Sequence, residues 1–146
     1  ATAADSARVR RAVAGGLDFW AALEETGLRA TPERLQLATR WITPIPLRRR
    51  FDTRFYAVRA PRQEVLAQDG EVQEWGWVTA EEALAGERVE LVYATRRILE
   101  MLVPIPEATL LLRRLRGRRE RRPVLPRISL GEGGPLVADD AAPLFR

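Results

Sequence analysis

The feature that most constrains the fold of this chain is an alternating stretch from Phe51 to Val58. Along F-D-T-R-F-Y-A-V the side chains change character with the period of two expected of a β-strand. A second extended segment is predicted at Glu71–Thr79. Thr79 then begins a helix, and Glu82, three residues later, completes a capping box. Strand, loop, strand and capped helix in this order predict the middle of an α/β domain.

The composition of the chain limits its class and its chemistry. With 146 residues, 46% of them hydrophobic, it is long enough for one domain with a real core. It shows no apolar run near the ~20 residues of a membrane span and no signal-peptide pattern, so we expect a cytoplasmic protein without a membrane partner. Cysteine and histidine are both absent, which excludes disulfides, thiolate metal sites and a Ser-His-Asp triad.

Two helices are predicted ahead of the strands. The first is Ala4–Ala14, with Asp5 or Ser6 as its N-cap, and the second is Leu17–Thr26, capped by Asp18. Five side chains are expected to face inward from these helices: Val9, Val13, Phe19, Ala22 and Leu23. Their apolar stripes need a partner, and the natural one is the first half of a domain, so we expect an incomplete core.

Further elements follow from hydrophobic periodicity. A strand is predicted at Gln36–Thr43, before the alternating stretch. The strongest helical pattern is Glu90–Leu102, and a shorter helix is predicted at Glu107–Arg116. After Gly117 the pattern fades, and we expect an extended tail. Its apolar side chains could dock on the domain or add an edge strand: Leu125, Ile128 and Leu130.

Four segments carry a family resemblance: R-W-I-T-P (40–44), R-R-F-D-T-R-F-Y (49–56), D-G-E-V-Q-E-W (69–75) and W-V-T-A-E-E-A-L (77–84). In this order they resemble the second half of a Nudix hydrolase, in the longer subgroup that is related to acyl-CoA diphosphatases. The resemblance covers roughly Ala7–Leu102, and the R-F-D-T-R-F-Y segment is its most specific part.

The defining motif of the family is not intact in this chain. The Nudix box has the form G-x5-E-x7-R-E-U-x-E-E-x-G-U, with U a bulky apolar residue, and its glutamates hold the divalent metal. Glu24–Leu28 fits only the closing part. The earlier box positions fall on residues of other types: Ser6, Ala12, Trp20 and Ala21. We therefore expect a helix that ends at Gly27, inside the helical insert of the longer subgroup. The box is expected upstream, and the chain, which begins at Ala1 rather than methionine, is expected to be a fragment or a processed product that starts just after the catalytic helix.

The resemblance implies an α/β (α+β) fold, namely a Nudix-like α/β/α sandwich with a mixed sheet that is incomplete at its N-terminus. Residues 1–102 would be the C-terminal portion of this domain, with a helical insert at 1–35 and with strands and a covering helix at 36–102. Residues 103–146 would form a short helix and a basic tail that contains proline and glycine.

The resemblance also implies an activity, the hydrolysis of a diphosphate linkage in a nucleoside-diphosphate derivative, CoA-like compounds included, with Mg²⁺ or Mn²⁺. Most metal ligands would lie outside this chain, so the chain alone is expected to be inactive. Glu71 and Glu74 are the candidate catalytic residues, because they match positions where related enzymes place an acidic residue near the metal or the attacking water. The structural alternative for both is a solvent-facing strand edge.

Arginine suits phosphate because the guanidinium offers paired donors at fixed geometry. Arg50, Asp52 and Arg54 are the candidate substrate-binding residues. The two arginines could grip substrate phosphates, or they could pair with Asp52 or Glu71 across strands. Three tryptophans could stack on a nucleobase or occupy the core or rim of the domain: Trp41, Trp75 and Trp77.

A second class of function remains open, a non-catalytic Nudix-like binding module. All 24 basic residues are arginine, the net charge is +4, and the excess is concentrated in Arg113–Arg122. A basic run of this kind can contact the phosphates of a nucleic acid, or it can be a solvated helix end.

Overall fold

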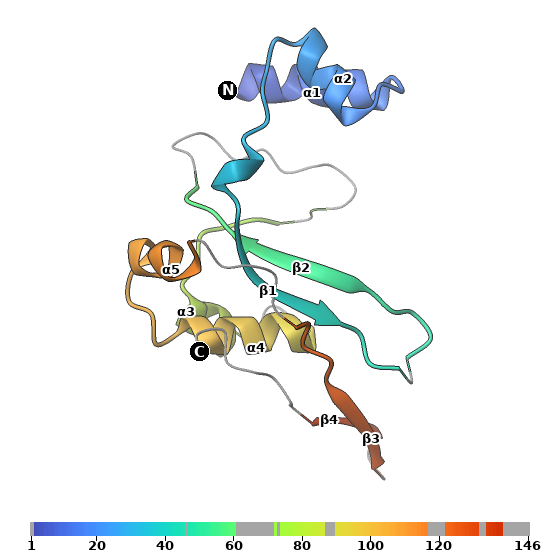
Figure 1. Ribbon diagram of the computed structural model, residues 1–146, viewed down its shortest axis with the longest axis vertical. Coiled ribbons are helices and arrows are strands. Elements are labelled where there is room, and N and C mark those ends of the chain that lie inside the picture. Colours follow the sequence, from blue (N-terminus) through green and yellow to red (C-terminus); the bar gives the residue numbers. More distant parts are fainter. Residues whose placement is uncertain are drawn as a thin grey trace. The chain divides into compact units, whose positions relative to one another are not determined.

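The computed structural model describes residues 2–45, 47–60, 72, 74–86, 90–116, 122–131 and 134–138, with backbone alone from 128 onward (Figure 1). The chain divides into two compact units. Unit 1 comprises Ala1–Arg34 and Ala60–Trp77, and unit 2 comprises Leu35–Arg59 and Val78–Arg146. The described residues form helices and two small antiparallel sheets, so the fold is of mixed α and β type, as predicted.

Unit 1 contains helices α1 (Ala3–Ala14) and α2 (Phe19–Glu25), which pack against each other. The predicted N-cap of α1 is wrong. Thr2 caps the helix, because its hydroxyl accepts a hydrogen bond from Asp5 N–H at 3.2 Å while Oδ2 of Asp5 accepts one from Thr2 N–H at 2.7 Å. The predicted cap of α2, Asp18, is confirmed.

The core of unit 1 is small. Val9, Ala22 and Leu23 are buried, as predicted. Val13 and Phe19 were also expected to face inward, but they are 41% and 52% exposed. Because α2 is only 7 residues long, it presents fewer than two turns of apolar face to α1. A short 3₁₀ turn, η1 (Pro32–Arg34), follows before unit 2 begins.

Unit 2 is organised around an antiparallel hairpin of β1 (Gln36–Ile42) and β2 (Asp52–Ala57), which confirms both predicted strands near these positions. The register places Trp41 opposite Thr53 and Arg40 opposite Arg54, with an irregularity between Leu37 and Thr39. Because side chains alternate along a strand, Trp41 and Thr53 share one face of the hairpin and the two arginines share the other.

A short segment near Val124 pairs with the other edge of β1. Val124 N–H donates to the Arg40 carbonyl at 2.8 Å, and Ile42 N–H donates to the Val124 carbonyl at 2.9 Å, as in a parallel bridge. Val124 is 8% exposed, whereas Leu125 is 41% exposed. The tail therefore does add an edge pairing, but through Val124 and not through the residues that were predicted.

The other two apolar tail residues lie in a separate hairpin of β3 (Arg127–Gly131) and β4 (Gly134–Ala138). Ile128 pairs with Val137, and Leu130 pairs with Pro135. Among the described strands, β3 pairs only with β4. Ile128 and Leu130 therefore belong to the β3–β4 hairpin and do not add a strand to the β1–β2 sheet.

Three helices complete unit 2 (Figure 1). Helix α3 (Ala80–Ala85) begins at the predicted capping box, in which Glu82 N–H donates to the Thr79 hydroxyl at 3.1 Å and Thr79 N–H donates to the Glu82 carboxylate at 2.7 Å. It packs against α4 (Tyr93–Leu102), which begins three residues later than predicted. Helix α5 (Ala108–Leu115) contacts β1 and buries Leu115 completely.

The strand predicted at Glu71–Thr79 does not form in the described part of that segment, Val72 and Glu74–Thr79. Trp75 and Trp77 are 52% and 72% exposed, so neither occupies a core. A strand is stable only when its backbone groups pair with a neighbour, and an alternating pattern cannot supply that neighbour.

Candidate functional site

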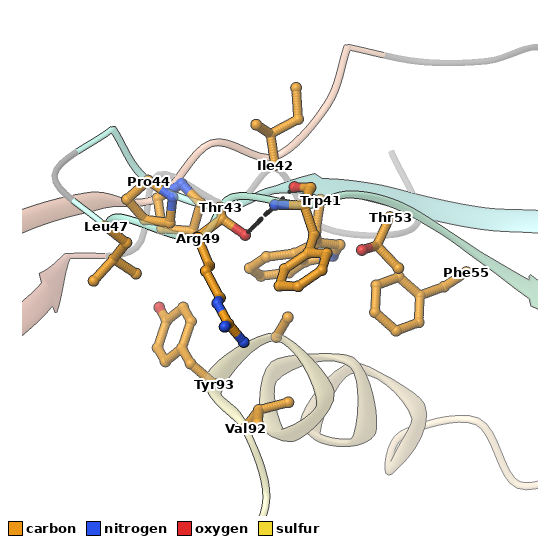
Figure 2. A pocket seen from close by; sticks show the side chains of 13 residues that line it. Trp41, Ile42, Thr43, Pro44, Leu47, Arg49, Thr53, Phe55, Val92 and Tyr93 are labelled. Atoms are coloured by element: carbon orange, nitrogen blue, oxygen red, sulfur yellow. Dashed lines mark hydrogen bonds between the residues drawn. The ribbon is translucent and has the colours of Figure 1, made fainter. Parts of the chain in front are cut away.

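One face of the β1–β2 hairpin and the start of α4 enclose a hollow of about 490 Å³ within unit 2 (Figure 2). Its lining is mostly apolar. It comes from the two hairpin strands, the loop between them, the start of α4 and Pro126. The lining residues are Trp41, Ile42, Thr43, Pro44, Leu47, Arg49, Phe51, Thr53, Phe55, Val92, Tyr93, Ala94 and Pro126. The volume is in the range of small-molecule sites, about 300–1,000 Å³.

Trp41 is the buried anchor of this hollow, with only 4% of its surface exposed. Its ring meets the ring of Tyr93 edge to face, with the centroids 6.1 Å apart and an interplanar angle of 73°. The indole Nε1 is buried and has no hydrogen-bond partner among the described residues. Trp41 therefore contributes apolar contact at this position at the expense of one unpaired N–H.

The loop between β1 and β2 is held by hydrogen bonds at its base. Thr43 N–H donates to the Phe51 carbonyl at 2.9 Å, and Phe51 N–H donates to the Thr43 hydroxyl at 3.0 Å. Nε of Arg50 donates to the Thr43 carbonyl at 3.0 Å. These bonds fix the rim of the hollow, and Figure 2 shows Arg49 extending from this loop toward the start of α4 and Tyr93.

The opposite face of the hairpin carries charges. Arg40 and Arg54 lie directly opposite each other, an arrangement that destabilises a strand pair through repulsion. The Asp52 carboxylate offsets this repulsion, because Nε and Nη2 of Arg40 donate to its two oxygens at 2.7 and 2.5 Å. These hydrogen bonds lower the pKa of Asp52, and the charges of Arg40 and Arg54 lower it further.

We expect the Asp52→Asn variant to be less stable than the wild type at pH 7, by an amount that shrinks at acidic pH. Because the folded-state pKa lies below the ordinary 3.8, ionised Asp52 stabilises the fold above that pH, and the contribution is lost as the pH falls through the folded-state pKa. Urea unfolding between pH 7 and pH 3 measures the difference. Glu81→Gln, an exposed carboxylate of α3, is the control and should show little effect at either pH. An Asp52→Asn effect that does not change with pH would contradict the ionic account.

Among the described residues of the predicted site, none lines this hollow. Glu71 lies outside the described residues, and Glu74 is exposed in a segment without secondary structure. Arg50 is on the loop, whereas Asp52 and Arg54 are on the face opposite the hollow. Asp52 pairs with Arg40 across the strands, because a diagonal position in the register brings Arg40 within reach, and the charge of Arg54 also acts on the Asp52 carboxylate.

The sequence prediction missed the hollow itself. Its walls combine positions about 50 residues apart, Trp41 and Tyr93, and no local pattern links them. One signal was available, because Trp41, Thr53 and Phe55 share one face of the predicted strand pair.

Whether the described residues fit a divalent metal can be tested on their donor groups. In the described ranges, no group of three or more Asp or Glu side chains lies close enough together to hold an ion. The described residues therefore provide no cluster of three carboxylates for an Mg²⁺ or Mn²⁺ ion. No family model, curated protein or solved structure matches the chain. Within the part of the chain that is described, every helix is too short or too polar to cross a bilayer.

Proposed function

We propose that this chain is the C-terminal portion of a Nudix hydrolase that cleaves a diphosphate linkage in a nucleoside-diphosphate derivative. One observation carries the proposal: the segment with the most specific resemblance, R-F-D-T-R-F-Y (50–56), contains most of β2, which pairs with the strand that carries R-W-I. A capped helix, α3, and the amphipathic helix α4 follow in the order that the resemblance implies. This order supports the family assignment.

The small size of the sheet in unit 2 supports the proposal that it is part of a larger α/β/α sandwich. Among the described residues the sheet consists of β1, β2 and the single bridge to Val124, whereas three or more strands with a covered face are typical of independently stable sheets. Phe51 on one face of the hairpin and Tyr56 on the other are 66% and 49% exposed. Large apolar side chains on both faces are typical of a sheet that further layers cover. In the proposal, residues outside this chain complete an α/β/α sandwich with a mixed sheet.

The proposal divides the chemistry between this chain and an upstream Nudix box. The box would supply most of the carboxylates for Mg²⁺ or Mn²⁺, in keeping with the lack of a group of three acidic side chains among the described residues. This chain would contribute phosphate contacts from the hairpin arginines Arg50 and Arg54, and an acidic side chain from Glu71 or Glu74. Arg50 is already tied to the Thr43 carbonyl through Nε, which orients its guanidinium at the loop.

Two observations test the proposal. The coding sequence upstream should continue in frame through an intact box, and an in-frame stop codon before such a box would contradict it. The purified chain, incubated with Mg²⁺ or Mn²⁺ and ADP-ribose, NADH or CoA, should release no mononucleotide, as measured by chromatography of the products. Turnover by the chain alone would show that metal ligands lie within it.

The dispersed carboxylates favour one second candidate, a non-catalytic binding module of the same shape. Asp52 is engaged by Arg40, and Glu74 is exposed apart from any described acidic cluster. In this alternative, Arg113–Arg122 would contact nucleic-acid phosphates. Binding to RNA or DNA would then fall steeply with salt concentration, and salt-independent binding would exclude the phosphate contact.

A further inference from the structure

The hollow on unit 2 combines an apolar interior with a cation at its rim. Trp41, Phe55 and Val92 supply apolar wall, and Arg49 reaches the cavity from the loop (Figure 2). Among the described residues, the Arg49 guanidinium has no hydrogen-bond or ion-pair partner, in contrast to Arg50 and Arg40. A guanidinium with unused donors beside an apolar cavity is complementary to an anion that carries an apolar group.

We propose that this hollow binds a small amphipathic anion, with the apolar group of the ligand against Trp41 and Phe55 and its phosphate at Arg49. The hydrogen bonds at the base of the loop hold the rim in place before a ligand arrives, which lowers the entropy lost on binding. The apolar walls favour a ligand with an apolar group, and the positive charge of Arg49 favours a ligand with a negative charge. The site requires neither metal nor catalysis.

Binding to the full 146-residue chain is measured by titration calorimetry with three probes: octyl phosphate, octyl glucoside and inorganic phosphate. Octyl phosphate should bind, octyl glucoside should bind about tenfold more weakly because it lacks the anion, and inorganic phosphate should give no detectable heat. Equal affinity for the two octyl compounds, or tight binding of inorganic phosphate alone, would overturn the proposal.

Two matched arginine variants locate the anion. Arg49→Gln should weaken octyl phosphate binding about tenfold and leave octyl glucoside binding unchanged. Arg48→Gln removes the same charge from the neighbouring position, which does not line the hollow, and should change the affinity less than about twofold. Both side chains are exposed, so both variants are expected to fold. Equal losses of affinity in the two variants would mean that the anion is attracted by the general positive charge of the loop and not bound by Arg49, and would overturn the proposal.

A third variant locates the apolar group. Ala94 lines the hollow from α4, and Ala94→Leu should weaken both octyl compounds because it fills space that the ligand needs. Far-UV circular dichroism checks that the variant is folded, and the arginine pair decides the question if it is not. Analytical sedimentation of the unliganded chain measures its oligomeric state and so tests whether a second copy of the chain fills the hollow. A dimer that Ala94→Leu abolishes would show that a second copy fills the hollow and would contradict the proposal.

Discussion

Replacing Trp41 with alanine is expected to lower the free energy of unfolding of unit 2 by about 4 kcal/mol, the largest effect of any single substitution considered for this chain. Trp41 is 4% exposed, and it is also the residue of β1 that lies between Thr53 on one side and Val124 on the other. Truncation to Ala removes the indole from the hairpin face and deletes its edge-to-face contact with Tyr93. Chemical denaturation followed by far-UV circular dichroism measures the loss.

The control for this prediction is Trp41→Phe. Phenylalanine keeps most of the buried apolar volume and removes the indole N–H, which has no partner among the described residues. An unpaired buried donor is itself destabilising, so its removal offsets part of the lost packing, and we expect a net loss of only about 1 kcal/mol. Equal losses for the two variants would mean that the N–H has a partner and that the packing account is wrong.

Replacing Leu115 with alanine is expected to lower the free energy of unfolding by about 3 kcal/mol. Leu115 is the last residue of α5 and is 1% exposed, so its side chain is the most completely buried large one among the described residues. Its truncation leaves a cavity in unit 2, where α5 contacts β1. Urea unfolding of the variant and the wild type, at one temperature and pH, measures the difference.

Leu125→Ala is the matched control for Leu115→Ala. It removes the same atoms from a side chain that is 41% exposed and belongs to the same unit, so the loss should stay below about 1 kcal/mol. If Leu125→Ala lowered the free energy of unfolding more than Leu115→Ala, the described burial of Leu115 in unit 2 would be contradicted.

Elements defined by local chemistry could be predicted from the sequence. The helix at Thr79 forms because Thr79 and Glu82 satisfy each other's backbone N–H groups, and this reciprocal pair is visible as a four-residue pattern. The strand at Asp52–Ala57 follows from strict alternation. Asp18 caps α2 for the same local reason as Thr79 caps α3.

Features that depend on distant partners could not be predicted. The pattern at Glu71–Thr79 resembles a strand, but its described residues form none, because a strand also needs a pairing partner that the local pattern does not specify. The pairing of Val124 with β1 joins residues about 80 positions apart. The Arg40–Asp52 pair depends on the register of the hairpin, which the loop sets. The hollow depends on where α4 begins relative to β1, and the sequence places that start three residues too early.

We propose that these residues belong to a metal-dependent enzyme that cleaves diphosphates, and an assay of a protein that includes the proposed upstream box tests this proposal most directly. With Mg²⁺ or Mn²⁺, that protein should convert at least one of CoA, ADP-ribose and NADH into two phosphate-bearing products, one of them a mononucleotide, and a chelator should abolish the reaction. A longer protein that contains an intact box and binds the metal, yet leaves all three compounds unchanged, would contradict the account.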